Sequence, residues 1–448
     1  MPAGIEDDLA PPMRVLIASH SHPRVLSGGS EVASYSLFQH LQDHDGFKAW
    51  YCGCTRSASF GRSGQSITQP FERDEYLYTV GDFEGFKFAN RDMAFARDFR
   101  ALLRNLRPDI VHFHHYVNFG MEAFAYVKEV VPEASIILTL HEFLAICHQQ
   151  GQMVTRQQGK LCRRSGYVEC SRCFPEMQPS DFFLRETYIR HFFRHVDRFV
   201  APSAFLARRY IEWGIDPDRI SVIENVPTRS RAAEIVPRTS VPGELRVGFF
   251  GQISVLKGIM VLIEAAAILE QEQQSDIELS IFGDYTNQPA AFQAEFLARV
   301  EKFGNNIAFH GAYNNSDVDE LMSDIDVVVV PSIWWENSPV VIQEALRNGR
   351  PVVCSNVGGM AEKVVAGEDG LHFQVGSARS LANVLKGLAA NPELLDKLGR
   401  GASRERDYDV AMARHLRLYR DVRPVASETE APPQRAAPDR PIPSFAVP

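Results

Sequence analysis

The sequence predicts an α/β protein made of two domains, each with a doubly wound parallel sheet, that face each other across a central cleft. Short apolar runs rich in β-branched residues alternate with helix-like segments, as is typical of a parallel sheet covered by helices on both faces. The alternation occurs twice, and a segment rich in proline and polar residues separates the two series at 227–243. A length of 448 residues is sufficient for two such domains and a tail.

The order of the elements follows from the two series of apolar runs. In the first series we expect helices at 30–41 and 122–131, and strands at 14–19, 110–113, 136–140, 199–201 and 221–223. In the second series we expect helices between strands at 247–250, 279–282, 307–310, 327–330 and 352–354. Because ligands bind at the carboxyl ends of the strands in such sheets, we expect these ends to line the cleft.

The domain boundaries follow from the same series. We expect an N-terminal Rossmann-like domain at 13–226, with a cysteine-rich insert at about 147–173, and a C-terminal Rossmann-like domain at 244–403. A helix at 404–422 should pack back on the N-terminal domain. Residues 423–448 are rich in proline, alanine and charge, and they cannot bury enough apolar surface to order themselves. We therefore expect a disordered tail there.

The composition excludes several classes of protein. With 45% hydrophobic and 23% charged residues, the chain resembles a soluble globular enzyme. A formal net charge of -9 argues against nucleic acid as a partner, because binding a polyanion usually needs a basic surface. No apolar stretch is long enough to span a bilayer, and the first residues do not form a secretion signal. These features predict a cytoplasmic protein.

The segment 332–344 has the features of a helix start that binds an anion. It follows the expected strand at 327–330 and reads Ser332-Ile-Trp-Trp-Glu336-Asn-Ser-Pro-Val-Val-Ile-Gln-Glu344. Ser338 suits the N-cap of the helix, Pro339 suits its first position, and Gly349 stops it. Backbone N–H groups at a helix start can hold the diphosphate of a sugar nucleotide. We therefore predict a donor-binding site at Glu336, Asn337, Ser338, Pro339, Val340 and Glu344.

The two glutamates of this segment have different expected roles. Glu336 lies just before the helix start, where its carboxylate can reach sugar hydroxyls. Glu344 lies one to two turns inside the helix, where its carboxylate can accept hydrogen bonds from a ribose diol. An isolated pair of this kind would more often be surface residues beside an ordinary helix. The full string around the pair favours the functional interpretation.

The segment 332–344 resembles the signature of the family-four retaining glycosyltransferases, in which two glutamates separated by seven residues bracket the donor site. Two further segments are similar to that family, Gly-Arg-Pro-Val-Val-Cys-Ser-Asn-Val-Gly-Gly at 349–359 and Arg-Pro-Asp-Ile-Val-His-Phe-His at 107–114. The resemblance covers nearly the whole chain except its two ends. It implies the GT-B fold, with the acceptor on the side of the N-terminal domain and the nucleotide sugar on the C-terminal domain.

The resemblance also implies an activity. A hexosyl-type sugar would move, with retention of anomeric configuration, from a GDP- or UDP-sugar to a glycan or lipid-linked glycan acceptor. Such a transfer would serve polysaccharide or glycoconjugate synthesis, and the family needs no catalytic metal for it. By this resemblance we expect His141, Glu336 and Lys257 to be the catalytic residues.

The segment 248–258 is the second candidate for donor binding. It reads Gly248-Phe-Phe-Gly-Gln252-Ile-Ser-Val-Leu-Lys257-Gly258, in which a strand ends in glycine and a helix begins near Gly258. Lys257 can meet the diphosphate as a point charge. The resembling family usually has an arginine where Gln252 stands, so this chain keeps a hydrogen-bonding side chain there but has one positive charge fewer.

Two further features follow strands of the first series. Gly28 and Gly29 lie in a loop after the first strand, where glycines let the backbone approach a phosphate or a sugar closely. His141 lies at the end of the strand expected at 136–140, where the family commonly has His-Asp and a histidine that faces the donor sugar. Here Glu142 stands in place of the aspartate. A plain turn and a structural histidine are the alternative interpretations.

Four cysteines cluster in the insert, and a structural zinc ion is the expectation for them. Cys170 and Cys173 have the spacing of half a zinc site, and Cys147 and Cys162 lie close by in the sequence. In a reducing cytoplasm, four thiols on one loop favour a metal over disulfide bonds. An iron–sulfur cluster and unliganded cysteines remain alternatives.

The insert is also basic. It contains a single acid, Glu169, and the basic residues Arg156, Lys160, Arg163, Arg164 and Arg172. These residues could face an anionic acceptor, or they could bring the protein to the inner membrane surface as a peripheral protein.

Two rival functions remain open. An epimerase acting on a nucleotide sugar would share the architecture, and it would form its product without an acceptor. A binding subunit whose catalysis has lapsed would hold the nucleotide tightly without turnover, and Gln252 is the feature that suggests it.

Overall fold

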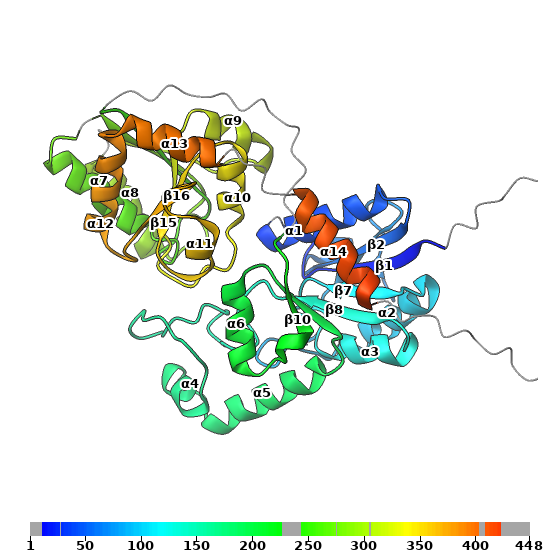
Figure 1. The fold of residues 1–448 in the computed structure, drawn as a ribbon. Helices are drawn as coiled ribbons and strands as arrows, with labels where there is room; N and C mark the ends of the chain where they lie inside the picture. The colour runs from blue at the N-terminus through cyan, green and yellow to red at the C-terminus, as the bar shows by residue number, and fades with distance from the viewer. Residues whose placement is uncertain are drawn as a thin grey trace, which may run out of the picture.

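A computed structural model describes residues 11–26, 28–225, 243–274, 276–303, 306–402 and 408–422 (Figure 1). It confirms the predicted fold class, because the chain forms two Rossmann-like α/β domains with parallel sheets. The proline-rich segment at 227–242, the tail at 423–448 and Ser27 of the glycine loop lie outside the described residues.

In the described part of the N-terminal domain, eight strands form one sheet in the order β10-β9-β8-β7-β1-β2-β4-β3. Every neighbouring pair is parallel except β3 and β4. These strands are β1 (Met13–Ala18), β2 (Phe47–Thr55), β3 (Ile67–Thr68), β4 (Glu75–Thr79), β7 (Ile110–Phe113), β8 (Ser135–Thr139), β9 (Arg198–Ala201) and β10 (Ile220–Val222). The short strands β5 (Phe83–Glu84) and β6 (Ala89–Asn90) pair separately.

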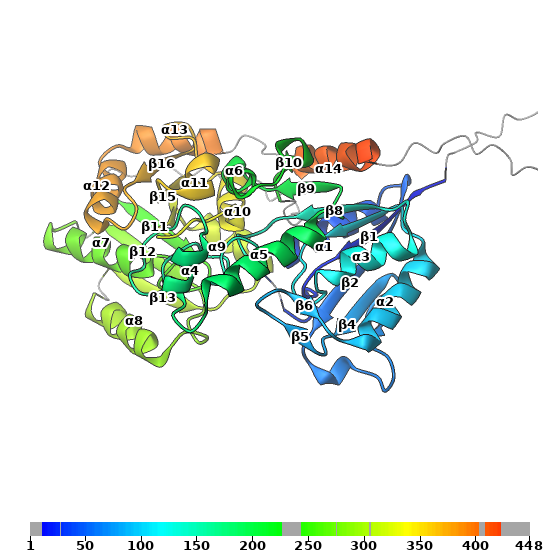
Figure 2. The same cartoon turned by 90° about the horizontal axis from the view of Figure 1, so that it is seen from below.

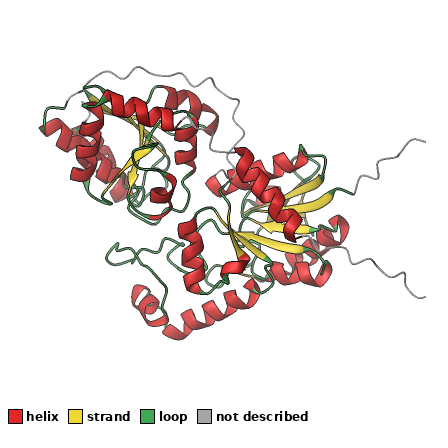
Figure 3. Cartoon of the chain, viewed as in Figure 1, coloured by secondary structure: helices red, strands yellow, loops and turns green. Residues whose placement is uncertain are grey.

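Helices cover this sheet on both faces (Figure 3). They are α1 (Gly29–Gln42), α2 (Met93–Leu106), α3 (Glu122–Val130), α4 (Tyr167–Cys173), α5 (Pro179–Phe193) and α6 (Ala204–Trp213), with 3₁₀ turns at Ala58–Phe60 and Pro217–Arg219. Side-chain caps fix where some of them begin. The Asp92 carboxylate accepts a hydrogen bond from Ala94 N at the start of α2, and the Ser203 hydroxyl accepts one from Leu206 N at the start of α6.

In the described part of the C-terminal domain, six strands form a parallel sheet in the order β13-β12-β11-β14-β15-β16. They are β11 (Leu245–Phe250), β12 (Ile277–Phe282), β13 (Ile307–Gly311), β14 (Val327–Val330), β15 (Val352–Ser355) and β16 (Gly370–Phe373). The helices are α7 (Ile259–Gln271), α8 (Ala290–Lys302), α9 (Val318–Ser323), α10 (Val340–Arg347), α11 (Gly358–Lys363), α12 (Ala378–Ala389) and α13 (Pro392–Ala402), with a 3₁₀ turn at Asn315–Asp317.

The central strands of both sheets are buried on both faces. In β14, four consecutive valines are all buried, as expected for a central strand of a parallel sheet covered by helices. In β1, alternate residues enter different cores. Leu16 packs with α2, whereas Val15 and Ile17 pack with α1. Burial of such side chains on both faces holds the strand ends in fixed positions around the cleft.

The last helix, α14 (Tyr408–Val422), lies against the N-terminal domain beside β1 and β7 (Figures 1 and 2). Met412 and Tyr419 are buried in the core shared with Val15 and Ile17. The Tyr419 hydroxyl and His112 Nδ1 are 2.6 Å apart, so the end of the described chain is bonded to the first sheet. Within the described residues, none of the helices combines the length and the apolar character that crossing a membrane requires.

Candidate active site

A cavity of about 750 Å³ lies between the two domains. It is lined on one side by the loop after β1 and the residues after β8, and on the other by the loops after β11 and β14. In each sheet the strand order reverses at β1 or at β11, and such switch points leave a crevice at the carboxyl ends of the strands. The predicted central cleft is therefore present as an opening that can admit a ligand.

Glu336 is held firmly in this cleft. Its Oε1 accepts hydrogen bonds from Lys257 Nζ at 2.6 Å, from Ser332 Oγ at 2.8 Å and from Trp334 Nε1 at 2.9 Å. The side chain is only 7% exposed. All three donors reach Oε1, so Oε2 is the oxygen through which the carboxylate can accept another hydrogen bond, such as one from a sugar hydroxyl.

The start of α10 differs from the prediction in one respect. Pro339 is the N-cap and the helix begins at Val340, so the prediction of Ser338 as N-cap and Pro339 as first helical residue was wrong by one position. The Ser338 hydroxyl donates to the Glu224 carboxylate of the other domain instead of capping the helix. Gly349 follows the helix with a positive φ of 65°, as the predicted stop requires.

Asn337 connects the two sides of the cleft. Its Oδ1 accepts a hydrogen bond from Ser203 Oγ at 2.7 Å, and its Nδ2 donates to the His141 carbonyl at 3.0 Å. Both partners belong to the N-terminal domain. The segment with Glu336 is therefore aligned with His141 by hydrogen bonds across the cleft.

Glu344 lies inside α10 and faces the same cleft. Burial raises the pKa of its carboxyl above the ordinary value. Tyr313 lines the cleft next to it, and burial together with the Glu344 charge raises the pKa of the Tyr313 hydroxyl. A partly desolvated carboxylate beside an aromatic ring suits the ribose and the base of a nucleotide.

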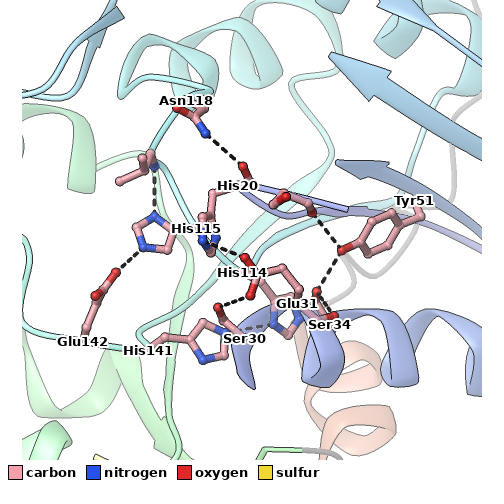
Figure 4. A network of polar contacts seen from close by, with 12 residues as sticks. His20, Ser30, Glu31, Ser34, Tyr51, His114, His115, Asn118, His141 and Glu142 are labelled. Atoms are coloured by element: carbon pink, nitrogen blue, oxygen red, sulfur yellow. Dashed lines mark hydrogen bonds and ion pairs between the residues drawn. The ribbon is translucent and has the colours of Figure 1, made fainter. Parts of the chain in front are cut away.

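His141 is neutral at physiological pH. Burial, followed by the nearby His115 and His20, lowers the pKa of His141 to about 3. Its Nε2 lies 3.1 Å from His114 Nδ1, and the two rings stack at 5.4 Å (Figure 4). A neutral imidazole held in this way can exchange a hydrogen bond with a sugar hydroxyl, but it does not bring a positive charge to the donor.

His20 and Glu31 form an ion pair that the sequence did not indicate as part of the site. His20 Nε2 lies 2.9 Å from Glu31 Oε1, and both residues line the cleft (Figure 4). Burial opposes ionisation of Glu31, but the hydrogen bond and charge of His20 prevail and lower the pKa of Glu31 to about 2. Burial would likewise lower the pKa of His20, yet the Glu31 carboxylate raises it. His115 Nε2 forms a hydrogen bond with Glu142 Oε1, and burial lowers the pKa of His115.

The predicted glycine loop reaches across the cleft. Gly28 and Gly29 both line it, and Gly28 is the N-cap of α1. A Cβ on Gly29 would lie 3.2 Å from Val340 Cγ2 at the start of α10. The absence of a side chain at Gly29 therefore lets the first domain come close to the helix start of the second.

Gln252 and Lys257 lie in the loop between β11 and α7, as predicted. Gln252 is exposed, and it lines the cleft. Lys257 precedes Gly258, the N-cap of α7, which has a positive φ of 73°. Among the described residues that line the cleft, Lys257 is the only lysine and none is an arginine, so it is the main positive charge available to a diphosphate.

The zinc site expected at Cys147, Cys162, Cys170 and Cys173 is not formed. Among the residues that the structure describes, no three His, Cys, Asp or Glu side chains are placed so that they could hold a metal ion, and these cysteines are free thiols. The expectation rested on the spacing of the cysteines in the sequence. In the fold, Ile146, Met153 and Phe174 are buried and order the insert without a metal.

Two Rossmann-like domains with a ligand cleft between them are the architecture of the GT-B glycosyltransferases. Residues 27–226 match the family model described as "Glycosyltransferase Family 4", and residues 231–405 match the one described as "Glycosyl transferases group 1". The two models together match nearly the whole chain apart from its ends. The chain belongs to the glycosyltransferases that these two models describe, as the resemblance of its motifs implied.

Curated relatives share part of the sequence. D-inositol 3-phosphate glycosyltransferase of Arthrobacter sp. (strain FB24) is 31% identical over 176 residues, which are 39% of this chain and 40% of that protein. The protein of the same name from Corynebacterium glutamicum (strain R) is 29% identical over 221 residues, or 46% of this chain and 52% of that protein. The chain thus spans about half the length of the curated relatives it matches.

Solved structures share the fold over most of the chain. HepE of Anabaena in complex with UDP superposes with a TM-score of 0.63 and 17% identity, covering 91% of this chain and 100% of that one. Sucrose-phosphate synthase of Thermosynechococcus elongatus superposes with a TM-score of 0.65 and 17% identity, covering 92% and 99%. At this level of identity the likeness shows the GT-B fold alone.

Proposed function

We propose that the protein is a retaining glycosyltransferase that moves a hexosyl-type sugar from a GDP- or UDP-sugar to a glycan or lipid-linked glycan, in polysaccharide or glycoconjugate synthesis. The observation that carries the proposal is the convergence of Glu336, Lys257 and the start of α10 on one cleft. The proposal is also supported by solved structures of a similar fold that contain UDP or UDP-glucose.

In this proposal the C-terminal domain binds the donor. The ribose diol donates to Glu344, and the diphosphate lies against the N–H groups at the start of α10 and against Lys257. Glu336 Oε2 accepts a hydrogen bond from a sugar hydroxyl, and Asn337, Ser338, Pro339 and Val340 shape the phosphate side. Gly28 and Gly29 let the N-terminal domain close over the donor, and His141 contacts the sugar.

Transfer then takes place on one face of the sugar. The bond between the anomeric carbon and the diphosphate oxygen breaks, and the acceptor oxygen bonds to that carbon from the same side. The acceptor's proton passes to the leaving diphosphate. Positive charge near the diphosphate lowers the barrier because negative charge develops there, and Lys257 together with the α10 dipole supplies it. No step in this scheme uses a metal ion.

A screen of nucleotide sugars tests the proposal. The protein is incubated with UDP- and GDP-hexoses, with and without glycan and lipid-linked glycan acceptors, and products are identified by mass spectrometry. Release of a nucleoside diphosphate and a glycosylated acceptor with unchanged anomeric configuration is expected. An epimerised nucleotide sugar formed without an acceptor, or tight nucleotide binding without turnover with every donor, would contradict it.

Replacing Glu344 with alanine should weaken the binding of the nucleoside diphosphate. The variant loses about two hydrogen bonds to a charged group, a cost of about 2–4 kcal/mol, and little stability is at stake because the carboxylate is already desolvated. Calorimetry with UDP and GDP measures the effect. Because the pKa of Glu344 is raised, wild-type affinity should fall as pH drops through that pKa, and Glu344→Gln should lose this dependence. An unchanged affinity in a folded Glu344→Ala variant would remove Glu344 from the site.

Replacing Gln252 with arginine should maintain or raise the transfer rate. The side chain is exposed in the cleft, so an arginine fits there and adds positive charge near the leaving diphosphate. Steady-state kinetics of Gln252→Arg measure the effect of the added charge on the transfer rate, and those of Gln252→Ala measure the effect of losing the hydrogen-bonding side chain. A large drop in rate for the arginine variant, with the fold intact, would show that Gln252 has a role of its own.

A further inference from the structure

The helical hairpin formed by α4 and α5 carries an exposed apolar patch. Large apolar side chains are exposed at eleven positions among the described residues, and four of them lie on this hairpin. They are Tyr167 at 39%, Val168 at 48%, Phe183 at 50% and Leu184 at 49%. The others are scattered singly over the chain. The Tyr167 and Phe183 rings meet edge to face at 5.6 Å, so exposed apolar side chains of the two helices are in contact.

Exposed basic side chains lie on α4 and in the segment that leads into it. Lys160, Arg163, Arg164 and Arg172 are all exposed, and none of them has an ion pair among the residues that the structure describes. Most acids nearby are already engaged. Glu176 pairs with Arg156, Glu186 with Arg190 and Glu212 with Arg209, which leaves Glu169 and Asp181 as the nearby acids without an ion pair among the described residues. The surface is positive in a chain whose formal net charge is -9.

A cavity of about 300 Å³ opens beside the patch. Arg163, Arg164 and Tyr167 line it, together with two ion pairs, Arg190 with Glu186 and Arg209 with Glu212. Its size and the charges of Arg163 and Arg164, which have no ion pair among the described residues, suit a phosphate head group. The apolar side chains and the cavity therefore offer two complementary contacts, one for hydrocarbon and one for phosphate.

The hairpin stands at an edge of the molecule next to the active cleft. α4 and α5 form the lower edge in Figure 1, and they face the viewer in Figure 2. The insert that leads into α4 contacts the C-terminal domain at the cleft, where Trp335 Nε1 donates to the Cys162 carbonyl at 2.8 Å. Trp335 itself lines the cleft.

We propose that the α4–α5 hairpin docks the protein on an anionic phospholipid surface, with Tyr167, Val168, Phe183 and Leu184 entering the head-group region. The charge favours this occupant over a second copy of the chain, because two such basic surfaces would repel each other in a symmetric contact. Lysines and arginines beside exposed aromatic and aliphatic side chains are the pattern of proteins that bind anionic membranes from one side. Docking on the membrane would present a lipid-linked acceptor to the cleft, and this role rests on the proposed function.

Cosedimentation of the full chain with vesicles tests the docking surface. Binding is expected to vesicles of phosphatidylglycerol and phosphatidylcholine, to weaken with salt, and to be absent with phosphatidylcholine alone. The double variant Arg163→Ala, Arg164→Ala should lower the partition coefficient about 20-fold. Phe183→Ser with Leu184→Ser should lower it about tenfold or more. Binding of the nucleoside diphosphate should not change in either variant, which shows that the fold is intact.

The matched control is Arg62→Ala with Arg73→Ala. It removes the same charge from exposed positions near β3 and β4, at the other edge of the sheet from β9 and α5. Equal losses in the control and hairpin variants, or equal binding to neutral and anionic vesicles, would overturn the proposal. So would a dimer that Phe183→Ser disrupts. The assay contains no sugar donor, so its result is independent of glycosyl transfer. A negative result would overturn the docking proposal without affecting the proposed function, and failure of the proposed function would not affect the docking result.

Discussion

Replacing Glu336 with glutamine is expected to lower kcat/KM for sugar transfer by about 10²-fold. Glutamine can still accept hydrogen bonds from Lys257, Ser332 and Trp334 through its carbonyl oxygen, so the local structure should hold. The second position becomes an amide that donates, and it can no longer accept from a sugar hydroxyl. A hydrogen bond to a charged group is worth about 1.5–3 kcal/mol, which corresponds to the expected loss.

The loss should appear in kcat, whereas the affinity for the nucleoside diphosphate should be unchanged or higher. Lys257 loses its carboxylate partner in the variant and becomes more available to the diphosphate. Glu301→Gln is the matched control, because Glu301 is exposed on α8 and does not line the cleft. Wild-type turnover in Glu336→Gln would show that the carboxylate does not contact the reacting sugar.

The sequence was sufficient to predict the architecture because the decisive strands are strongly apolar. The strand β14 consists of four valines. Glu336 lies in the loop after this strand and Glu344 lies in the helix α10 that follows, so the strand–loop–helix order places both glutamates at the same edge of the sheet. β2 was missed, although it is central to the first sheet. Its residues, Phe-Lys-Ala-Trp-Tyr-Cys-Gly-Cys-Thr, include a lysine and a glycine, and they show neither alternation nor a continuous β-branched run.

Contacts between distant parts of the chain explain what the sequence could not predict. Ser338 has the side chain of an N-cap, but Glu224 of the other domain takes its hydroxyl. His20 and Glu31 are separated by a loop and a turn of helix, so only the fold shows that they form an ion pair. The four cysteines of the insert were close in sequence, yet burial of Met153 and Phe174 gives the insert a different means of ordering.

Replacing Gly359 with alanine is expected to lower transfer by about 10²-fold or more, although this residue does not line the cleft. Gly359 N donates to the Glu336 carbonyl at 2.6 Å, so α11 packs directly against the segment that carries Glu336. A Cβ at Gly359 would lie 1.5 Å from the Asn337 carbonyl oxygen and 3.0 Å from that of Glu336. Backbone atoms cannot move aside as a flexible side chain can, so the whole segment must shift.

That shift would displace both Glu336 and the contacts that Asn337 makes across the cleft. Asn337 holds Ser203 and the His141 carbonyl across the cleft, and a displacement of about 1 Å in such a site can cost about 10²-fold in rate. Overpacking should also cost about 1–3 kcal/mol of stability, measured by thermal unfolding. Gly387→Ala is the matched control, because nothing lies within 4 Å of a Cβ there. Inside α12 the same substitution should raise stability by about 0.5–1 kcal/mol and leave transfer unchanged. If both variants keep full activity, the segment at Glu336 does not need its observed position for transfer.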